Sequence, residues 1–101
     1  MLNILTDNIQ NWGHDRQIIQ NGKPMGQAIK TLEECTELLD AINKGDKDEI
    51  ADAIGDIYVT LVMVAGTCNL SIYECIEKAY FEIKDRKGTL TKEGVFVKDE
   101  K

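Results

Sequence analysis

Acidic side chains recur at helical spacing in two neighbouring segments of this chain. Glu34 and Glu37 are three residues apart, and Asp52 and Asp56 are four residues apart. At these spacings two side chains share one face of an α-helix. Two such helices lying side by side would gather four carboxylates, which is costly in a poorly solvated place unless a divalent cation neutralises them. Oxygen-only ligands favour Mg²⁺ or Mn²⁺, so the spacing predicts a metal site.

The same acids also have interpretations that involve no chemistry. The glutamates of the first segment would suit a solvated helix face, and the helix dipole favours Asp52 near a helix start. The dipole accounts poorly for Asp56, which lies about two turns into its helix and shares a face with Val59 and Met63. Asp56 is therefore the acid that most needs a cation.

Four helices are expected to position these acids. Their ranges are about 3–20, 27–44, 47–68 and 72–87. Capping-box pairs open the last two, Asp46 with Glu49 and Ser71 with Glu74, and Gly45 suits the end of the second. The expected fold is all-α and four-helix-bundle-like, a single domain over residues 1–101 with a core at about 3–88. Residues 89–101 form an extended tail in which "VFV" favours a short strand.

Apolar periodicity predicts which helix faces are buried. The second helix carries a stripe at i, i+4, i+7, i+11 and i+14, expected to face the core: Ala28, Leu32, Cys35, Leu39 and Ile42. From Ile57 onward the third helix is apolar on every side, so it must be central or covered by a second subunit. A homodimer or homotetramer is expected.

Composition narrows the function classes. The formal net charge of −6 argues against nucleic acid or an anionic membrane as the main partner. The apolar run from Ile57 is short for a membrane span, and the N-terminal residues do not resemble a secretory signal. Three cysteines in apolar, helical contexts are interpreted as reduced core residues. A cytoplasmic protein is expected.

Two long segments resemble one protein family. "KTLEECTELLDAI" followed by "EIADAIGDIYVTLVMVAGTCNLSI" resembles the MazG-type all-α nucleoside triphosphate pyrophosphohydrolases. Their signature is E-x-x-E on one helix and E-x-x-D on the next. The flanks, "W…R…Q..K" upstream and "AYFEIKDRKG" downstream, are similar to those of small phage-type members, whose location would be a host cytoplasm. The resemblance covers about residues 10–90.

The resemblance implies a ligand set, with one departure. Glu34 and Glu37 would be the first metal-binding pair, and Asp56 the Asp of E-x-x-D. The Glu position of that second motif falls on Ala53, so Asp52 is taken to stand in for it. A second registration, on Glu49 and Asp52, matches the letters but spoils the downstream spacing.

The reaction implied is hydrolysis of a nucleoside triphosphate to the monophosphate and pyrophosphate, with Mg²⁺ or Mn²⁺ as cofactor. Glu33 or Asp52 would accept the proton of the attacking water. The implied substrate-binding residues are Trp12, Gln27, Lys30, Lys84 and Arg86. Several have simpler roles: Lys30 as an ion-pair partner of Glu34, Trp12 as a core residue, and the cations near residue 85 as complements to a helix dipole. The alternative function is a non-catalytic, dimeric acidic helical protein that binds a basic partner.

Overall fold

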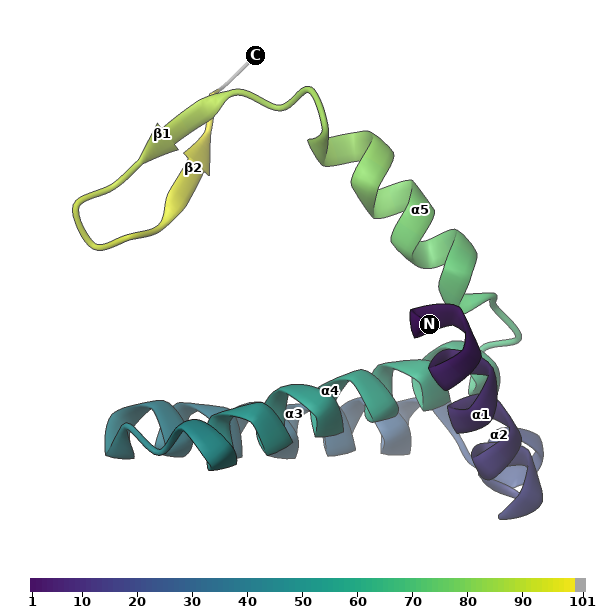
Figure 1. Ribbon diagram of the computed structural model, residues 1–101. Helices are drawn as coiled ribbons and strands as arrows, with labels where there is room; N and C mark the ends of the chain where they lie inside the picture. The colour runs from purple at the N-terminus through teal and green to yellow at the C-terminus, as the bar shows by residue number, and fades with distance from the viewer. Residues whose placement is uncertain (100–101) are drawn as a thin grey trace.

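The computed structural model describes residues 1–99 and is mainly helical (Figure 1). Five helices are followed by a two-stranded antiparallel hairpin. Their bounds are α1 Leu2–Asp15, α2 Ile18–Asn21, α3 Pro24–Lys44, α4 Lys47–Thr67, α5 Ile72–Ile83, β1 Gly88–Leu90 and β2 Phe96–Lys98. The all-α class predicted from the sequence is confirmed.

Local capping signals fix most helix ends where the sequence predicted them. The Asp46 carboxylate accepts a hydrogen bond from the Glu49 backbone N–H at 3.1 Å, which starts α4. The Ser71 hydroxyl does the same for Glu74 at 3.3 Å and starts α5. Gly45 ends α3 in the left-handed region at φ 71°, where glycine carries no steric penalty. α3 begins three residues earlier than predicted because Pro24 is suited to the first helical position.

The first predicted helix is two helices. Gln17 adopts φ 65° between α1 and α2, which turns the chain so that Ile18 and Ile19 pack against the core. α1 also approaches α4 closely near this turn, because a Cβ built on Gly13 would lie 2.6 Å from the sulfur of Met63. The break between α1 and α2 therefore allows two isoleucines, Ile18 and Ile19, to pack against the core residues of α4.

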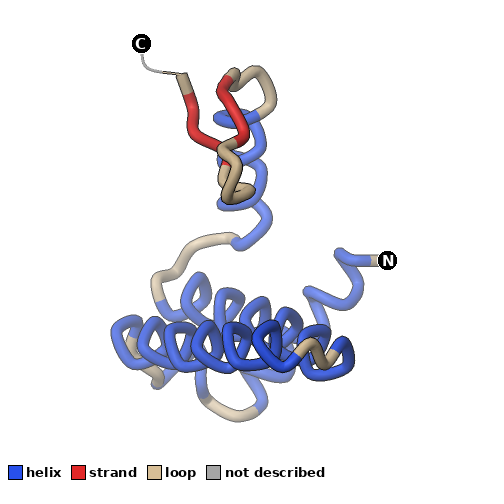
Figure 2. The backbone as a smooth tube through the Cα atoms, turned by 90° about the vertical axis from the view of Figure 1, so that its left-hand side faces the viewer, coloured by secondary structure: helices blue, strands red, loops and turns tan. Residues whose placement is uncertain are grey.

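α4 is the centre of the molecule, as its apolar surface predicted. It packs against α1, α2, α3 and α5, and it supplies most of the buried core, which comprises Val62, Met63, Ala65 and Ile72. α3 runs antiparallel beside α4 (Figures 1 and 2). The hydroxyl of Thr31 on α3 donates to that of Thr60 on α4 at 2.8 Å, which marks the sides on which the two helices face each other.

The predicted core stripe of α3 is wrong for the single chain. Leu32 and Leu39 are each 67% exposed, and Ile42 is 56% exposed. The less exposed stripe lies one position earlier at every turn: Gln27, Thr31, Glu34, Leu38 and Ala41. A shift of one position rotates the face by about 100°, so the large apolar residues of α3 point along its side rather than into α4.

The last part of the chain stands apart from the rest. α5 packs against α4, and in its first turn the Tyr73 hydroxyl donates to the Asn3 carbonyl at 2.8 Å and to the Asp7 carboxylate at 2.6 Å, both on α1. The two strands contact only each other among the elements within residues 1–99. Figure 1 shows α5 leading away from the α3–α4 pair and the hairpin beyond it. The predicted strand at "VFV" is present as β2, whereas the helix predicted to reach residue 87 ends at Ile83. We call residues 72–99 the C-terminal arm.

One further expectation is corrected. All three cysteines are free, but Cys68 and Cys75 are exposed rather than buried in a core. Within the described residues α4 is long and apolar enough to meet the length and composition of a membrane span, since an 18-residue window of it has a mean hydropathy of 1.5. The central helix of a soluble domain meets the same criterion, and α4 carries Asp52 and Asp56 within its span.

Candidate functional site

Carboxylates from α3 and α4 line a common pocket of about 260 Å³. We call it the carboxylate pocket; its lining residues are Glu37, Ala41, Glu49, Asp52, Ala53 and Asp56. The antiparallel pairing of α3 and α4 creates it, because residues that precede the facing stripe on each helix lie on the same side of the pair. Both registrations of the second acidic motif reach this pocket. Position 53, where the family pattern has Glu, also faces it, and here Ala53 is 4% exposed.

Glu34 lies at the inner edge of this group, on the side of α3 that faces α4. Its Oε2 atom is buried without a hydrogen-bond partner in the described structure. Burial raises the pKa of Glu34, and the neighbouring charges of Glu37 and Asp56 raise it further, while Lys30 opposes them. A carboxylate surrounded by like charges and lacking a donor is the environment that a cation relieves.

The carboxylates fit a divalent cation in chemistry, but their side chains are not in a ligating arrangement here. Within residues 1–99 no group of three or more His, Cys, Asp or Glu side chains stands close enough together to hold a metal ion. Like-charged carboxylates separate when nothing neutralises them, and Glu side chains are long and rotatable. The orphaned Glu34 oxygen and the shared pocket therefore support a site that closes when a cation enters.

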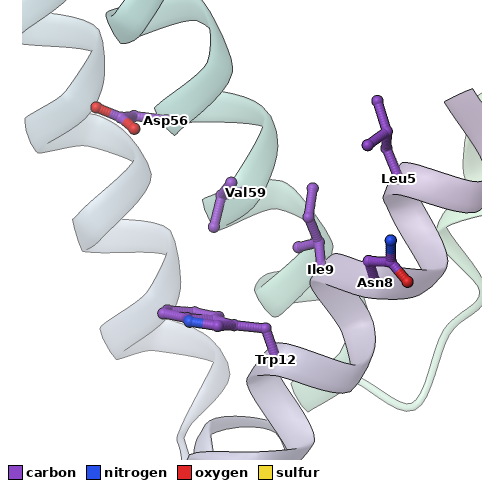
Figure 3. Close-up of a pocket in the computed structure, with 6 residues that line it drawn as sticks. All are labelled: Leu5, Asn8, Ile9, Trp12, Asp56 and Val59. Atoms are coloured by element: carbon purple, nitrogen blue, oxygen red, sulfur yellow. The ribbon is translucent and has the colours of Figure 1, made fainter.

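An apolar pocket of about 610 Å³ adjoins the carboxylates through Asp56 (Figure 3). α1 supplies Leu5, Asn8, Ile9 and Trp12 to it, and α4 supplies Val59 and Asp56. Trp12 is 41% exposed, and the Arg16 guanidinium lies 4.7 Å from the centroid of its ring. One aromatic ring is thus presented at the edge of a pocket whose other end is acidic.

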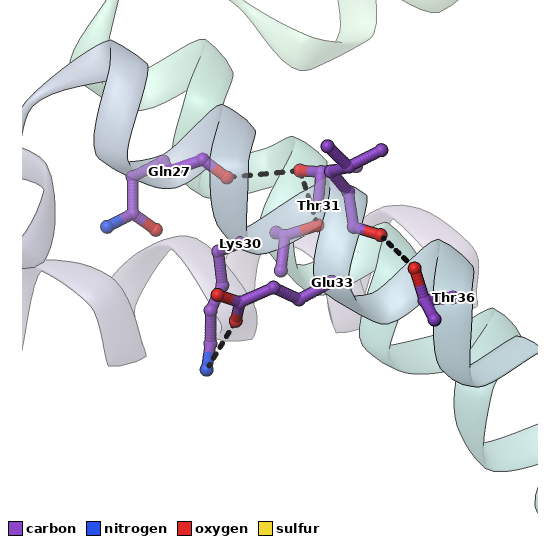
Figure 4. A network of polar contacts seen from close by, with 7 residues as sticks. Gln27, Lys30, Thr31, Glu33 and Thr36 are labelled. Atoms are coloured by element: carbon purple, nitrogen blue, oxygen red, sulfur yellow. Dashed lines mark hydrogen bonds and ion pairs between the residues drawn. The ribbon is translucent and has the colours of Figure 1, made fainter.

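Gln27 and Lys30 line a third pocket, of about 240 Å³, which shares Trp12 and Val59 with the apolar one. The three pockets follow one another along the same side of the α3–α4 pair. Lys30 lies 3.8 Å from Glu33, an exposed ion pair (Figure 4); the sequence had suggested Glu34 as its partner. Glu33 lines none of the three pockets, whereas Asp52 lines the carboxylate pocket.

Lys84 and Arg86 do not line the carboxylate pocket of their own chain. Lys84 pairs with Asp85 at 3.0 Å, and both cations follow the far end of α5, away from the α3–α4 pair (Figure 1). The structure thus gathers Trp12, Gln27, Lys30, Glu34, Glu37, Asp52 and Asp56 on one side of the molecule and leaves these two cations outside that group.

Sequence reasoning overlooked the α1 contribution to the apolar pocket. Leu5, Asn8 and Ile9 were not among the predicted site residues. The missing signal is the angle at which α1 crosses α4, which depends on the Gln17 turn. Glu49 was treated mainly as a capping residue; it caps and lines the pocket as well, and it pairs with Lys44 at 3.4 Å.

A comparison with known protein families assigns the chain to a family. The family model of the MazG nucleotide pyrophosphohydrolase domain matches residues 26–91, a range that contains all but the first two residues of α3, the whole of α4 and α5, and all the acids of the carboxylate pocket. The chain belongs to this family.

A relative is found in Haemophilus phage HP1 (strain HP1c1), an uncharacterized 18.2 kDa protein in the rep-hol intergenic region. It is 39% identical over 61 residues, 60% of this chain and 37% of the phage protein. The chain therefore matches little more than a third of that protein. No solved structure matches.

Proposed function

We propose that this protein is a Mg²⁺-dependent nucleoside triphosphate pyrophosphohydrolase that releases pyrophosphate and leaves a nucleoside monophosphate. The family supports nucleotide pyrophosphohydrolase activity in general. The observation that carries the finer proposal is Glu34, whose buried, unpartnered oxygen lies near the charges of Glu37 and Asp56. Mn²⁺ is expected to substitute for Mg²⁺, since both prefer oxygen ligands.

The proposed ligands are Glu34 and Glu37 from α3 with Asp52 and Asp56 from α4. When bound, the cation would neutralise phosphate charge and polarise the phosphorus under attack. Asp52 and Glu33 remain the two candidates for accepting the proton of the attacking water. Pocket geometry favours Asp52, because Glu33 is directed to Lys30 outside the carboxylate pocket.

The apolar pocket is proposed to hold the base and sugar of the substrate. Its aromatic edge, Trp12, suits stacking on a base, and its other end, Asp56, is shared with the carboxylate pocket. A nucleotide spanning both pockets would place its phosphates against the acids. Lys30 and Gln27, in the adjoining pocket, would contact the substrate from the α3 side. A cytoplasmic location, where nucleoside triphosphates are abundant, is part of this proposal.

The test is pyrophosphate release from a panel of ribo- and deoxynucleoside triphosphates with Mg²⁺, with Mn²⁺ and with EDTA. We expect metal-dependent release in which monophosphate and pyrophosphate appear in equal amounts. Release of orthophosphate with a diphosphate product would contradict the proposed bond cleavage. No turnover across the panel, from folded protein that binds the cation, would favour the non-catalytic alternative and make Ala53→Glu the first reversion to examine.

A further inference from the structure

α1 supplies most of the side chains that line the apolar pocket, yet few apolar contacts hold this helix in place. Two of its residues are buried, Thr6 and Gly13, and neither has a large apolar side chain. Ile9 packs partly against the core, but Leu2 and Ile4 are 63% and 55% exposed. Hydrophobic burial alone therefore gives the N-terminal half of α1 only a weak preference for one position.

One polar contact joins α1 to α4 at the level of the apolar pocket. The Thr6 side chain is fully buried, and its hydroxyl lies 2.8 Å from the Tyr58 hydroxyl. Tyr58 lies on α4 between Asp56 and Val59, which both line the pocket. A buried hydroxyl without a partner is costly, so this pair favours the position of α1 in which the two oxygens meet.

A second polar contact joins α1 to α5. The Tyr73 hydroxyl lies 2.6 Å from the Asp7 carboxylate and 2.8 Å from the Asn3 carbonyl oxygen, so it bridges two neighbouring turns of α1. The hydrogen bond to Asp7 raises the pKa of Tyr73 to about 12, and the hydroxyl therefore keeps its proton at neutral pH. A hydrogen bond to an ionised carboxylate is stronger than one between neutral groups.

The residues of α1 that are held and the residues that line the pocket occupy different faces of the helix. Asn3, Thr6 and Asp7 share one face at spacings of three and four residues. The pocket-lining residues, from Leu5 to Trp12, share another (Figure 3). At about 100° per residue the centres of the two faces are roughly 160° apart. The tyrosines thus fix the rotation of α1 without occupying the pocket.

We propose that Tyr58 and Tyr73 are positioning residues for nucleotide binding, whose hydroxyls hold α1 across α4 so that its lining face meets Asp56. This inference rests on the proposed function, which assigns the apolar pocket to the base and sugar. When the hydroxyls are removed, α1 occupies this position for a smaller fraction of the time. The apparent dissociation constant of the nucleotide rises in inverse proportion to that fraction.

The first test is the steady-state kinetics of Tyr58→Phe, Tyr73→Phe and the double variant with the triphosphates of the activity panel and Mg²⁺. Each single exchange removes one oxygen and keeps the ring. We expect KM to rise roughly 2- to 10-fold in each single variant and about tenfold or more in the double variant. kcat should stay within about twofold, because the proposed metal ligands come from α3 and α4.

The matched control is Tyr80→Phe, the same exchange farther along the C-terminal arm. Tyr80 is 57% exposed and takes part in neither contact, so KM should equal that of the parent. A merely structural role of the two tyrosines would lower the melting temperature and leave KM unchanged. Unchanged KM in the double variant would therefore overturn the proposal, as would an equal rise in Tyr80→Phe.

Variants of Thr6 test the contact with Tyr58 from the other side. Thr6→Val removes the hydroxyl at nearly constant volume, and Thr6→Ser keeps it. Thr6→Val should raise KM as Tyr58→Phe does, whereas Thr6→Ser should retain a KM near that of the parent. Equal KM values for these two variants would overturn the role given to Tyr58.

Fluorescence of Trp12 gives a readout that needs no turnover, since Trp12 is the only tryptophan of the chain. Quenching of the metal-free protein by acrylamide should increase in the double variant and stay unchanged in Tyr80→Phe. Unchanged quenching in the double variant would overturn the anchoring of α1. An inactive protein in which quenching still increases would instead overturn the proposed function, so the two failures can be distinguished.

Discussion

The two sides of the α3–α4 pair carry opposite chemistry on the same backbone. On one side are the acids of the carboxylate pocket, and on the other are exposed aliphatic residues of both helices: Leu32, Leu39, Ile42, Ile54 and Leu61. Each side is unfavourable in an isolated chain: acids crowd together on one, and large apolar surface meets water on the other. The divalent cation that we propose for the carboxylate pocket would relieve the first side, and the homodimer expected from the sequence would cover the second.

The unfavourable free energy of each side is relieved in a different way. Repulsion among carboxylates depends on pH and is relieved by a cation, whereas exposed apolar surface is relieved by burial, which depends on protein concentration and hardly on pH. Two different experimental variables should therefore act on the two sides of one helix pair.

The largest expected effect is on turnover at the acidic side. Asp56→Asn removes the acid that lines both the carboxylate pocket and the apolar pocket. Loss of a residue that only orients a metal-binding side chain already lowers metal affinity or activity about 10- to 100-fold. Loss of Asp56, a proposed metal-binding side chain itself, should therefore lower turnover by at least about 100-fold. Steady-state release of pyrophosphate measures it.

The matched control for that variant is Asp48→Asn, the same exchange in the first turn of α4. Asp48 is exposed and lines none of the three pockets, so turnover should change little. Equal loss in both variants would mean that general charge, rather than the pocket, supports activity.

The next largest effect is on thermal stability, which should depend on pH and metal through the acidic side of the α3–α4 pair. The raised pKa of Glu34 means that the folded, metal-free protein favours its protonated form. Ionisation of Glu34 therefore costs more in the folded protein than in the unfolded chain. The folded protein avoids this cost at low pH, and its stability falls as pH rises through the raised pKa. A cation reverses the penalty only where Glu34 is ionised. At 100-fold excess over its dissociation constant it adds about 2.7 kcal/mol, which raises the melting temperature of a domain of this size by roughly 10–20 °C.

We therefore expect the rise in melting temperature caused by Mn²⁺ to be large at neutral pH and to disappear in acid. Calorimetry at several pH values checks this. In Glu34→Gln the metal effect should be lost at all pH values, while the metal-free variant melts no lower than the parent at neutral pH. A metal effect that persists unchanged in acid would contradict the role given to this carboxylate.

A smaller effect is expected at Trp12. Trp12→Ala removes the aromatic edge of the apolar pocket, and base–aromatic stacking is worth about 1–3 kcal/mol. The Michaelis constant should rise about tenfold or more with little change in kcat, because the ring contacts the base and not the reacting phosphate. Trp12→Phe should recover much of the loss. A fall in kcat alone would place Trp12 in the chemistry instead.

The smallest effect concerns two glycines of α4 that belong to neither side. A Cβ on Gly55 would meet nothing within 4 Å, whereas one on Gly66 would lie 2.9 Å from Ile19. Gly55→Ala should stabilise by about 0.5–1 kcal/mol through helix propensity. Gly66→Ala should destabilise by about 1–3 kcal/mol through overpacking against α2. Chemical denaturation measures the change in the free energy of unfolding for each variant. Changes of the same sign in both variants would contradict the packing described here.

Local signals in the sequence predicted the parts of the fold that local interactions determine. The Asp46 and Ser71 caps and the Gly45 terminus are set by hydrogen bonds within a few residues, so their residue types suffice. The apolar periodicity of α3 predicted the wrong face, because Leu32, Leu39 and Ile42 are exposed in the single chain. The polar residues Thr31 and Glu34 face α4 instead, because a hydroxyl pair and a carboxylate site occupy that contact.

The site was predictable in its acids and not in its shape. Helical spacing places Glu34 with Glu37 and Asp52 with Asp56, and helix pairing brings the two sets to one side. The apolar pocket depends on how α1 crosses α4, which follows from the left-handed turn at Gln17. The residue types around Gln17 do not predict this turn, since positive φ is uncommon for glutamine.

The most direct test of the central claim is titration of Mn²⁺ into the metal-free protein, with free Mn²⁺ followed by electron paramagnetic resonance. We expect saturable binding by the unmodified chain, its loss in Asp56→Asn and Glu34→Gln, and its retention in Asp48→Asn. Binding that is equally weak in all four proteins would contradict a cation site between α3 and α4.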